Sequence, residues 1–105
     1  MFHEIKQGDI LSVERIQNRL LVVSKNYFNQ TEQVIVCPIL QKSSDDPLHI
    51  EFCTPEMQGS VMCEQLKLLD LRVRGYKKVS ELRMEDVMNI ADAVQSIFDY
   101  YPFGK

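Results

Sequence analysis

The most reactive side chains in this 105-residue sequence belong to two histidines and three cysteines: His3, His49, Cys37, Cys53 and Cys63. The cysteines are odd in number and have no C-x-x-C spacing, so the sequence predicts neither a disulfide framework nor a zinc site. We expect three buried, reduced thiols. Cys63 would act as a nucleophile only if a histidine lay beside it in the fold.

His49 is the candidate general base, because an imidazole with a pKa of ~6.5 exchanges protons near neutrality. The surrounding segment, Pro47 to Phe52, alternates apolar and polar residues, which is typical of a half-buried strand. His49 then points away from the apolar side chains, so we expect it to be exposed or to face a groove. A surface histidine without a catalytic role is the alternative.

The overall charge excludes one class of function. The net charge is −3, so the chain does not coat nucleic acid through its global charge. Folding could still gather basic residues into a local groove, and the candidates are Arg15, Arg19, Lys25, Lys42, Arg72, Arg74, Lys77 and Lys78.

Short apolar segments separated by turns predict a mainly β fold in a single domain over residues 1–105. The expected strands lie at 10–13, 19–24, 33–40, 47–52, 60–65 and 66–73, with a loop or single helical turn at 26–31. From Met84 to Tyr100 the period changes. Val87, Ile90, Val94 and Ile97 recur at the spacing of an amphipathic helix, and we expect them to face inward. Strands followed by one terminal helix indicate an α+β fold or a small antiparallel barrel.

No apolar run approaches the ~20 residues of a membrane-spanning helix. The N-terminus also lacks a basic head followed by an apolar stretch. We therefore expect a cytoplasmic protein with no membrane span.

Several short motifs follow one another along the chain: Gly8-Asp9-Ile10, Arg19 to Ser24, Asn26 with Asn29, Val34 to Ile39, Pro47 to Glu51, and Val61 to Gln65. In this order they resemble the GD[IV], RP-x-LVVS, ND-x-FN, VIV-x-P[IL], P-x-HVE and [ED]Q segments of the MazF/PemK family of type II toxin–antitoxin toxins. The resemblance extends from about Lys6 to Phe98.

This resemblance implies an SH3-like barrel with a C-terminal helix that pairs as a homodimer, uses no metal or cofactor, and is restrained by an acidic antitoxin. Family members are growth inhibitors that cut single-stranded RNA, such as mRNA, through attack of the ribose 2′-hydroxyl on the adjacent phosphate. Arg19 matches the family's catalytic arginine. A guanidinium suits the phosphate because its planar fork donates two hydrogen bonds and stays charged.

The chain departs from the family at three places. Leu20 replaces the proline after the arginine, Leu40 stands where the catalytic threonine is expected, and the Gly-rich first loop is shortened to residues 14–18. Gln41, Ser43 or Ser44 could supply the donor that Leu40 lacks. With Arg19 and His49 as the expected catalytic residues, the expected substrate contacts are Arg15, Asn18, Lys25, Gln41, Lys42 and Ser43.

An alternative function takes these departures at face value. The chain would then be a binding module of the MazF/CcdB-like superfold that cleaves no RNA and acts through a protein partner such as an antitoxin or DNA gyrase. The aromatic residues at 98–103 could anchor such an interface. A tail packed on the core, or a dimer contact, would also explain them.

Overall fold

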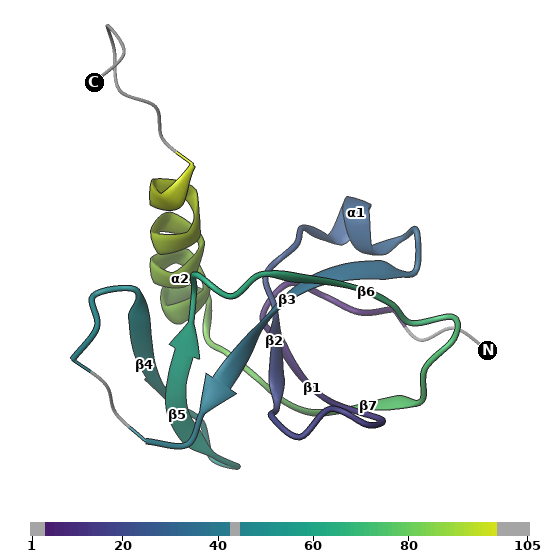
Figure 1. Cartoon of the computed structure of the whole chain (residues 1–105), viewed down its shortest axis with the longest axis horizontal. Coiled ribbons are helices and arrows are strands. Elements are labelled where there is room, and N and C mark those ends of the chain that lie inside the picture. Colours follow the sequence, from purple (N-terminus) through teal and green to yellow (C-terminus); the bar gives the residue numbers. More distant parts are fainter. Residues whose placement is uncertain (1–3, 43–44, 99–105) are drawn as a thin grey trace, which may run out of the picture.

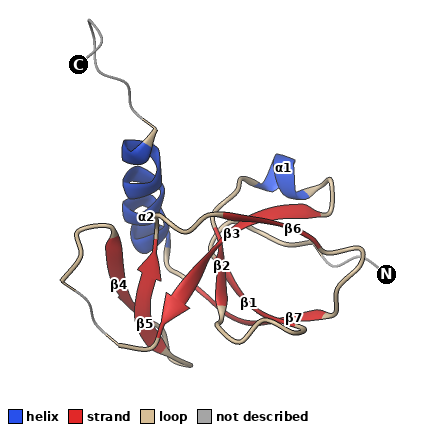
Figure 2. Cartoon of the chain, viewed as in Figure 1, coloured by secondary structure: helices blue, strands red, loops and turns tan. Residues whose placement is uncertain are grey.

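The structure is a computed structural model that describes residues 4–42 and 45–98 (Figure 1). In this part of the chain, antiparallel strands form a curled sheet, and the longer of two helices follows the last strand (Figure 2). The elements are β1 (Asp9–Val13), β2 (Leu20–Val22), α1 (Asn26–Asn29), β3 (Gln33–Leu40), β4 (His49–Cys53), β5 (Gln58–Met62), β6 (Lys67–Asp70), β7 (Tyr76–Glu81) and α2 (Met84–Ile97). The expected fold class, a mainly β fold with a small antiparallel barrel and a C-terminal helix, is confirmed, and the sheet curls into a half-barrel.

Strand β3 organises the sheet, because both of its edges are paired. One edge pairs with β2, whereas the other pairs first with β6, through residues 33–36, and then with β5, through residues 39–40. Pro38 lies where the second edge changes partner. Proline has no backbone N–H, so the strand offers no donor at this junction.

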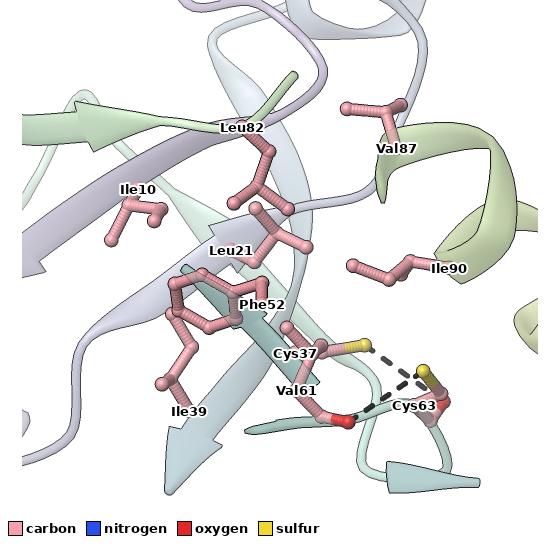
Figure 3. Packing of buried hydrophobic residues seen from close by; sticks show 10 residues of the cluster. All are labelled: Ile10, Leu21, Cys37, Ile39, Phe52, Val61, Cys63, Leu82, Val87 and Ile90. Carbon is pink, nitrogen blue, oxygen red and sulfur yellow. Dashed lines mark hydrogen bonds between the residues drawn. The ribbon is translucent and has the colours of Figure 1, made fainter. Parts of the chain in front are cut away.

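Two hydrophobic cores lie on opposite faces of β3. The first core contains Cys37 and Ile39 from β3, together with Phe52, Val61 and residues of α2 (Figure 3). The second core contains Val34 and Val36 and is completed by residues from β1, β2 and β6. The continuous apolar run of β3 thus reflects burial on both faces.

Helix α2 begins at Met84, as expected, but it ends at Ile97 rather than at Tyr100, and residues 99–105 lie outside the described part. Val87 and Ile90 are buried and Val94 is half-buried, whereas Ile97 is 38% exposed. The prediction that Ile97 faces inward is therefore wrong. The last turn of the helix extends past β4 and β5, so no strand lies beneath it (Figure 1).

Strand β7 was not expected from the sequence, and β6 is shorter than the expected strand. Only Lys67–Asp70 of the expected 66–73 segment pairs, as β6, with β3. Strand β7 has a polar, lysine-containing sequence, YKKVSE, and it forms because it pairs with β1. Its stability comes from a partner more than 60 positions away in the chain, which local composition does not reveal.

A buried polar cluster joins β2, α1 and β3. The Asn29 side chain, 1% exposed, donates from Nδ2 to the carbonyl oxygens of Ser24 at 3.1 Å and Ile5 at 3.3 Å. The Ser24 hydroxyl donates to Asn29 Oδ1 and accepts from the Ile35 N–H at 3.0 Å. The second asparagine of the Asn26/Asn29 motif therefore holds the fold together.

We predict that Asn29→Ala lowers the free energy of unfolding by about 2 kcal/mol, because it leaves buried carbonyl and hydroxyl groups without their partner. The matched control is Asn26→Ala, which removes an exposed hydrogen bond from the Gln7 N–H and should cost about 0.5 kcal/mol. Urea unfolding at equilibrium measures both values. Equal losses for the two variants would contradict the structural role of Asn29.

Candidate functional site

A cleft of about 480 Å³ opens where the β1–β2 loop meets the end of β3. Its lining consists of Gln17, Asn18, Arg19, Ile39, Leu40, Gln41, Lys42 and Met57. Arginine and lysine supply the charged groups of this lining, and none of its residues is acidic. On a chain with a net charge of −3, the cleft is a local concentration of positive charge.

Arg19 combines a fixed backbone with an exposed side chain. Its carbonyl oxygen accepts a hydrogen bond from the Ile39 N–H at 2.9 Å, which ties the head of β2 to the end of β3. Its Nη1 lies 3.4 Å from the Ser12 hydroxyl on β1. Within residues 4–42 and 45–98 no carboxylate forms an ion pair with Arg19. The guanidinium charge is therefore available to an anion in the cleft.

The remaining polar groups of the cleft are anchored through the sheet. Asn18 Nδ2 donates to the Ile39 carbonyl at 3.0 Å, which fixes the shortened first loop against β3. The buried Ser60 hydroxyl donates to the Lys42 carbonyl at 3.0 Å, so the Lys42 backbone is held while its side chain is exposed. Leu40 is half-buried and lines the cleft. The position that lacks the expected threonine hydroxyl thus belongs to the cleft rather than to the core.

The structure brings together four of the expected site residues: Asn18, Arg19, Gln41 and Lys42. Arg15 lies exposed in the same loop, in the left-handed backbone region at φ 68°, but outside the cleft lining. Lys25 precedes α1 and lines a different hollow, beside Tyr27 and Met84. Ser43 and Ser44 lie outside the described residues.

His49 also lies outside the cleft lining, and it is half-buried rather than exposed. Its side chain is only 12% exposed, and Nε2 is 3.2 Å from Glu64 Oε1 and 3.9 Å from Asp46 Oδ2. The pKa of Glu64 lies below its ordinary value. Burial acts to raise it, but hydrogen bonds from the Glu64 backbone, from His49 and from Gln65 outweigh burial. The imidazole therefore joins the beginning of β4 to the segment after β5.

The cysteines are not arranged for nucleophilic chemistry. Burial is the main reason that the pKa of Cys37 rises to about 12 and that of Cys63 to about 11, and the charge of Glu64 adds to both shifts. Both thiols sit in the first core, where each lies near a backbone carbonyl oxygen (Figure 3). Cys53 is exposed at the end of β4, so the expectation of three buried thiols is wrong for that residue.

Ser12, which contacts the Arg19 guanidinium, was not among the residues expected at the site. The signal was present in the alternation of β1, because Leu11 and Val13 enter the second core and Ser12 must face the other way. Among the described residues, no group of three or more His, Cys, Asp or Glu side chains is placed to hold a metal ion. No described helix is long and apolar enough to cross a membrane.

Comparison with known protein families shows to which family the chain is related. Residues 6–98 match the family described as PemK-like, MazF-like toxins of type II toxin–antitoxin systems. The chain belongs to this family. No curated protein sequence matches it.

Solved structures of MazF proteins share the fold of this PemK/MazF family member. The MazE–MazF crystal structure (form I) from Deinococcus radiodurans is 17% identical, covering 92% of this chain and 98% of that chain with a TM-score of 0.83. An endoribonuclease from a mycobacterial species is 16% identical, covering 95% and 97%, with a TM-score of 0.79. A mycobacterial endoribonuclease in complex with its cognate antitoxin is 15% identical, covering 95% and 100%, with a TM-score of 0.75.

The Glu64 contacts predict how stability depends on acid. Because the pKa of Glu64 is lowered in the folded state, its contribution is present above the ordinary value of 4.5 and is lost as the pH falls below it. Glu64→Gln should therefore reduce the difference in unfolding midpoint between pH 7 and pH 3.5. Glu51→Gln, an exposed change on β4, is the control and should leave the difference intact. The prediction is refuted if Glu64→Gln shows the same difference in unfolding midpoint between pH 7 and pH 3.5 as the wild type.

Proposed function

We propose that this toxin is an endoribonuclease that cuts single-stranded RNA, such as mRNA, in the cytoplasm, without a metal ion, by attack of the ribose 2′-hydroxyl. One observation supports this function above the others. The cleft between the first loop and β3 presents Arg19 and Lys42 without an acidic lining residue, on a chain that is acidic overall. A phosphodiester backbone is the kind of anion that such a cleft attracts.

Arg19 is the proposed catalytic residue. Its guanidinium would donate two hydrogen bonds to the phosphate oxygens on which charge grows during attack, and it stays charged at every working pH. Its fixed backbone places the donor before the reaction begins, which is what electrostatic stabilisation of a transition state requires.

Other lining residues would hold the substrate. The amide of Gln41 and the ammonium of Lys42 can bind RNA beside Arg19, and Asn18 keeps the loop in place. Leu40 offers no hydroxyl, and His49 is engaged with Glu64 away from the cleft. We therefore expect slower cleavage than in family members that keep the threonine.

An acidic antitoxin is the proposed protein partner. The relatives solved as MazE–MazF and as an endoribonuclease with its cognate antitoxin have the same fold as this chain. A negatively charged partner segment would be attracted to the same cleft as RNA and would compete with it.

Arg19→Ala should lower the rate of RNA cleavage by roughly 10²- to 10³-fold, because removing such a donor costs ~2 to 4 kcal/mol of transition-state stabilisation. Leu40→Thr should raise the rate, since the position lines the cleft. The assay incubates each purified protein with mixed single-stranded RNA in EDTA and detects cyclic-phosphate and 5′-hydroxyl ends.

Arg72→Ala is the control for this assay, because Arg72 pairs with Asp70 after β6, away from the cleft lining, and its loss should leave the rate unchanged. Equal background from wild type, Arg19→Ala and Leu40→Thr would reject the enzyme. The binding module that acts through DNA gyrase or an antitoxin would then be the surviving function.

We also propose that the chain forms a homodimer through the outer face of α2. Met84 and Met88 lie one helical turn apart and are 70% and 58% exposed. Large apolar side chains exposed at helical spacing are typical of an interaction surface.

Sedimentation equilibrium at micromolar concentration should report a dimer for the wild type and a monomer for Met88→Glu, because the carboxylate would lose its hydration in the interface. The control is Val73→Glu, an equally drastic change at an exposed residue between β6 and β7. A monomeric wild type would reject the dimer, and a dimeric Met88→Glu would move the interface elsewhere.

A further inference from the structure

Arg19 is one end of a row of polar side chains that crosses three strands. In the antiparallel β1–β2 pair, Leu11 is opposite Leu20, so the next residues, Ser12 and Arg19, face each other. On the other side of β1, Ser12 is paired directly with Lys77 of β7. The 3.4 Å contact between Arg19 Nη1 and the Ser12 hydroxyl agrees with this register.

The three side chains share one face of the sheet. Leu11, Val13 and Leu20 enter the second core, so the alternate residues of β1 and β2 point to the opposite face. On that face Ile10 and Leu21 belong to the first core, whereas Ser12 and Arg19 lie beyond its edge. The row is therefore open to a ligand.

The charges at the two ends of the row are uncompensated. Lys77 is exposed, and no described carboxylate forms an ion pair with it or with Arg19. Its neighbour Lys78 differs, because its Nζ lies 3.2 Å from both the buried Asp9 and Glu81. Further along β7 in the same direction, the Ser80 hydroxyl is hydrogen-bonded to Thr54 and Glu56. The carboxylate of Glu56 lies there, so the positively charged surface does not continue past Ser80.

We propose that Lys77 and Ser12 extend the Arg19 cleft into a phosphate-binding track, in which Lys77 binds a phosphate that neighbours the one held by Arg19. The inference rests on the proposed RNA substrate. The backbones at Arg19 and Lys77 are two strand spacings of about 4.8 Å apart, or roughly 10 Å. The two cations can therefore each bind a different phosphate of one RNA strand. Ser12 lies between the cations, where its hydroxyl accepts from Arg19 and can donate to RNA.

The test measures binding of a single-stranded 2′-O-methyl RNA, which lacks the attacking hydroxyl and cannot be cut, by fluorescence anisotropy over a salt series. Lys77→Gln should reduce the slope of log K against log salt by ~0.7, the value for one phosphate contact on a single strand. If the two proteins bind equally at 1 M salt, this difference in slope makes Lys77→Gln bind about fivefold more weakly than the wild type at 0.1 M salt. Ser12→Ala should weaken binding without changing the slope, because a neutral hydroxyl releases no counterion.

Lys67→Gln is the matched control, since it removes an exposed lysine from β6 outside this row and should leave affinity and slope unchanged. If the wild type binds the RNA and Lys77→Gln shows the same slope of log K against log salt, the phosphate-binding track is overturned and the proposed function stands. Wild type that binds the RNA with the predicted slopes but cuts no natural RNA would support the track and reject the enzyme. Wild type that fails to bind would overturn both.

Discussion

The structure depends on burying both faces of β3. Its even-numbered residues Val34 and Val36 enter one core and its odd-numbered residues Cys37 and Ile39 enter the other, so a single strand supports both halves of the molecule. A strand in this position must be apolar on both faces and paired on both edges. The backbone hydrogen bond from the Ile39 N–H to the Arg19 carbonyl then carries this rigidity to the candidate cleft, because it fixes the head of β2 against the end of β3.

The cleft combines a rigid frame with exposed cations. Asn18, Arg19 and Lys42 each have a backbone or amide group held by the sheet, while the charged ends of Arg19 and Lys42 remain in solvent. Attraction of an anion is local here, since the rest of the acidic chain repels it. Such an arrangement favours a ligand that brings its negative charge close to these two cations, and it makes association sensitive to ionic strength.

The features that could be predicted from sequence are those with a local signal. The apolar run of β3 and the periodicity of α2 follow from hydrophobic burial, and Arg19 follows from its place in a family motif. The failures share a different cause. Strand β7 is polar and forms by pairing with β1, His49 is half-buried beside Glu64 fifteen positions away, and Ser12 meets Arg19 and Lys77 only across neighbouring strands. These properties arise from strand register, which no window of neighbouring residues contains.

Pro38 sits at the one place on β3 where the missing donor does least harm. Ile39 bonds toward β2, so Pro38 faces the other edge, at the gap between the β6 and β5 ladders. A shift of β3 by one residue would turn the proline toward β2, remove a hydrogen bond from the ladder and exchange the contents of the two cores. Pro38 thus helps to fix the register of β3, because a shifted sheet would lose a hydrogen bond at the proline. An uninterrupted run of valine and isoleucine would carry no such penalty.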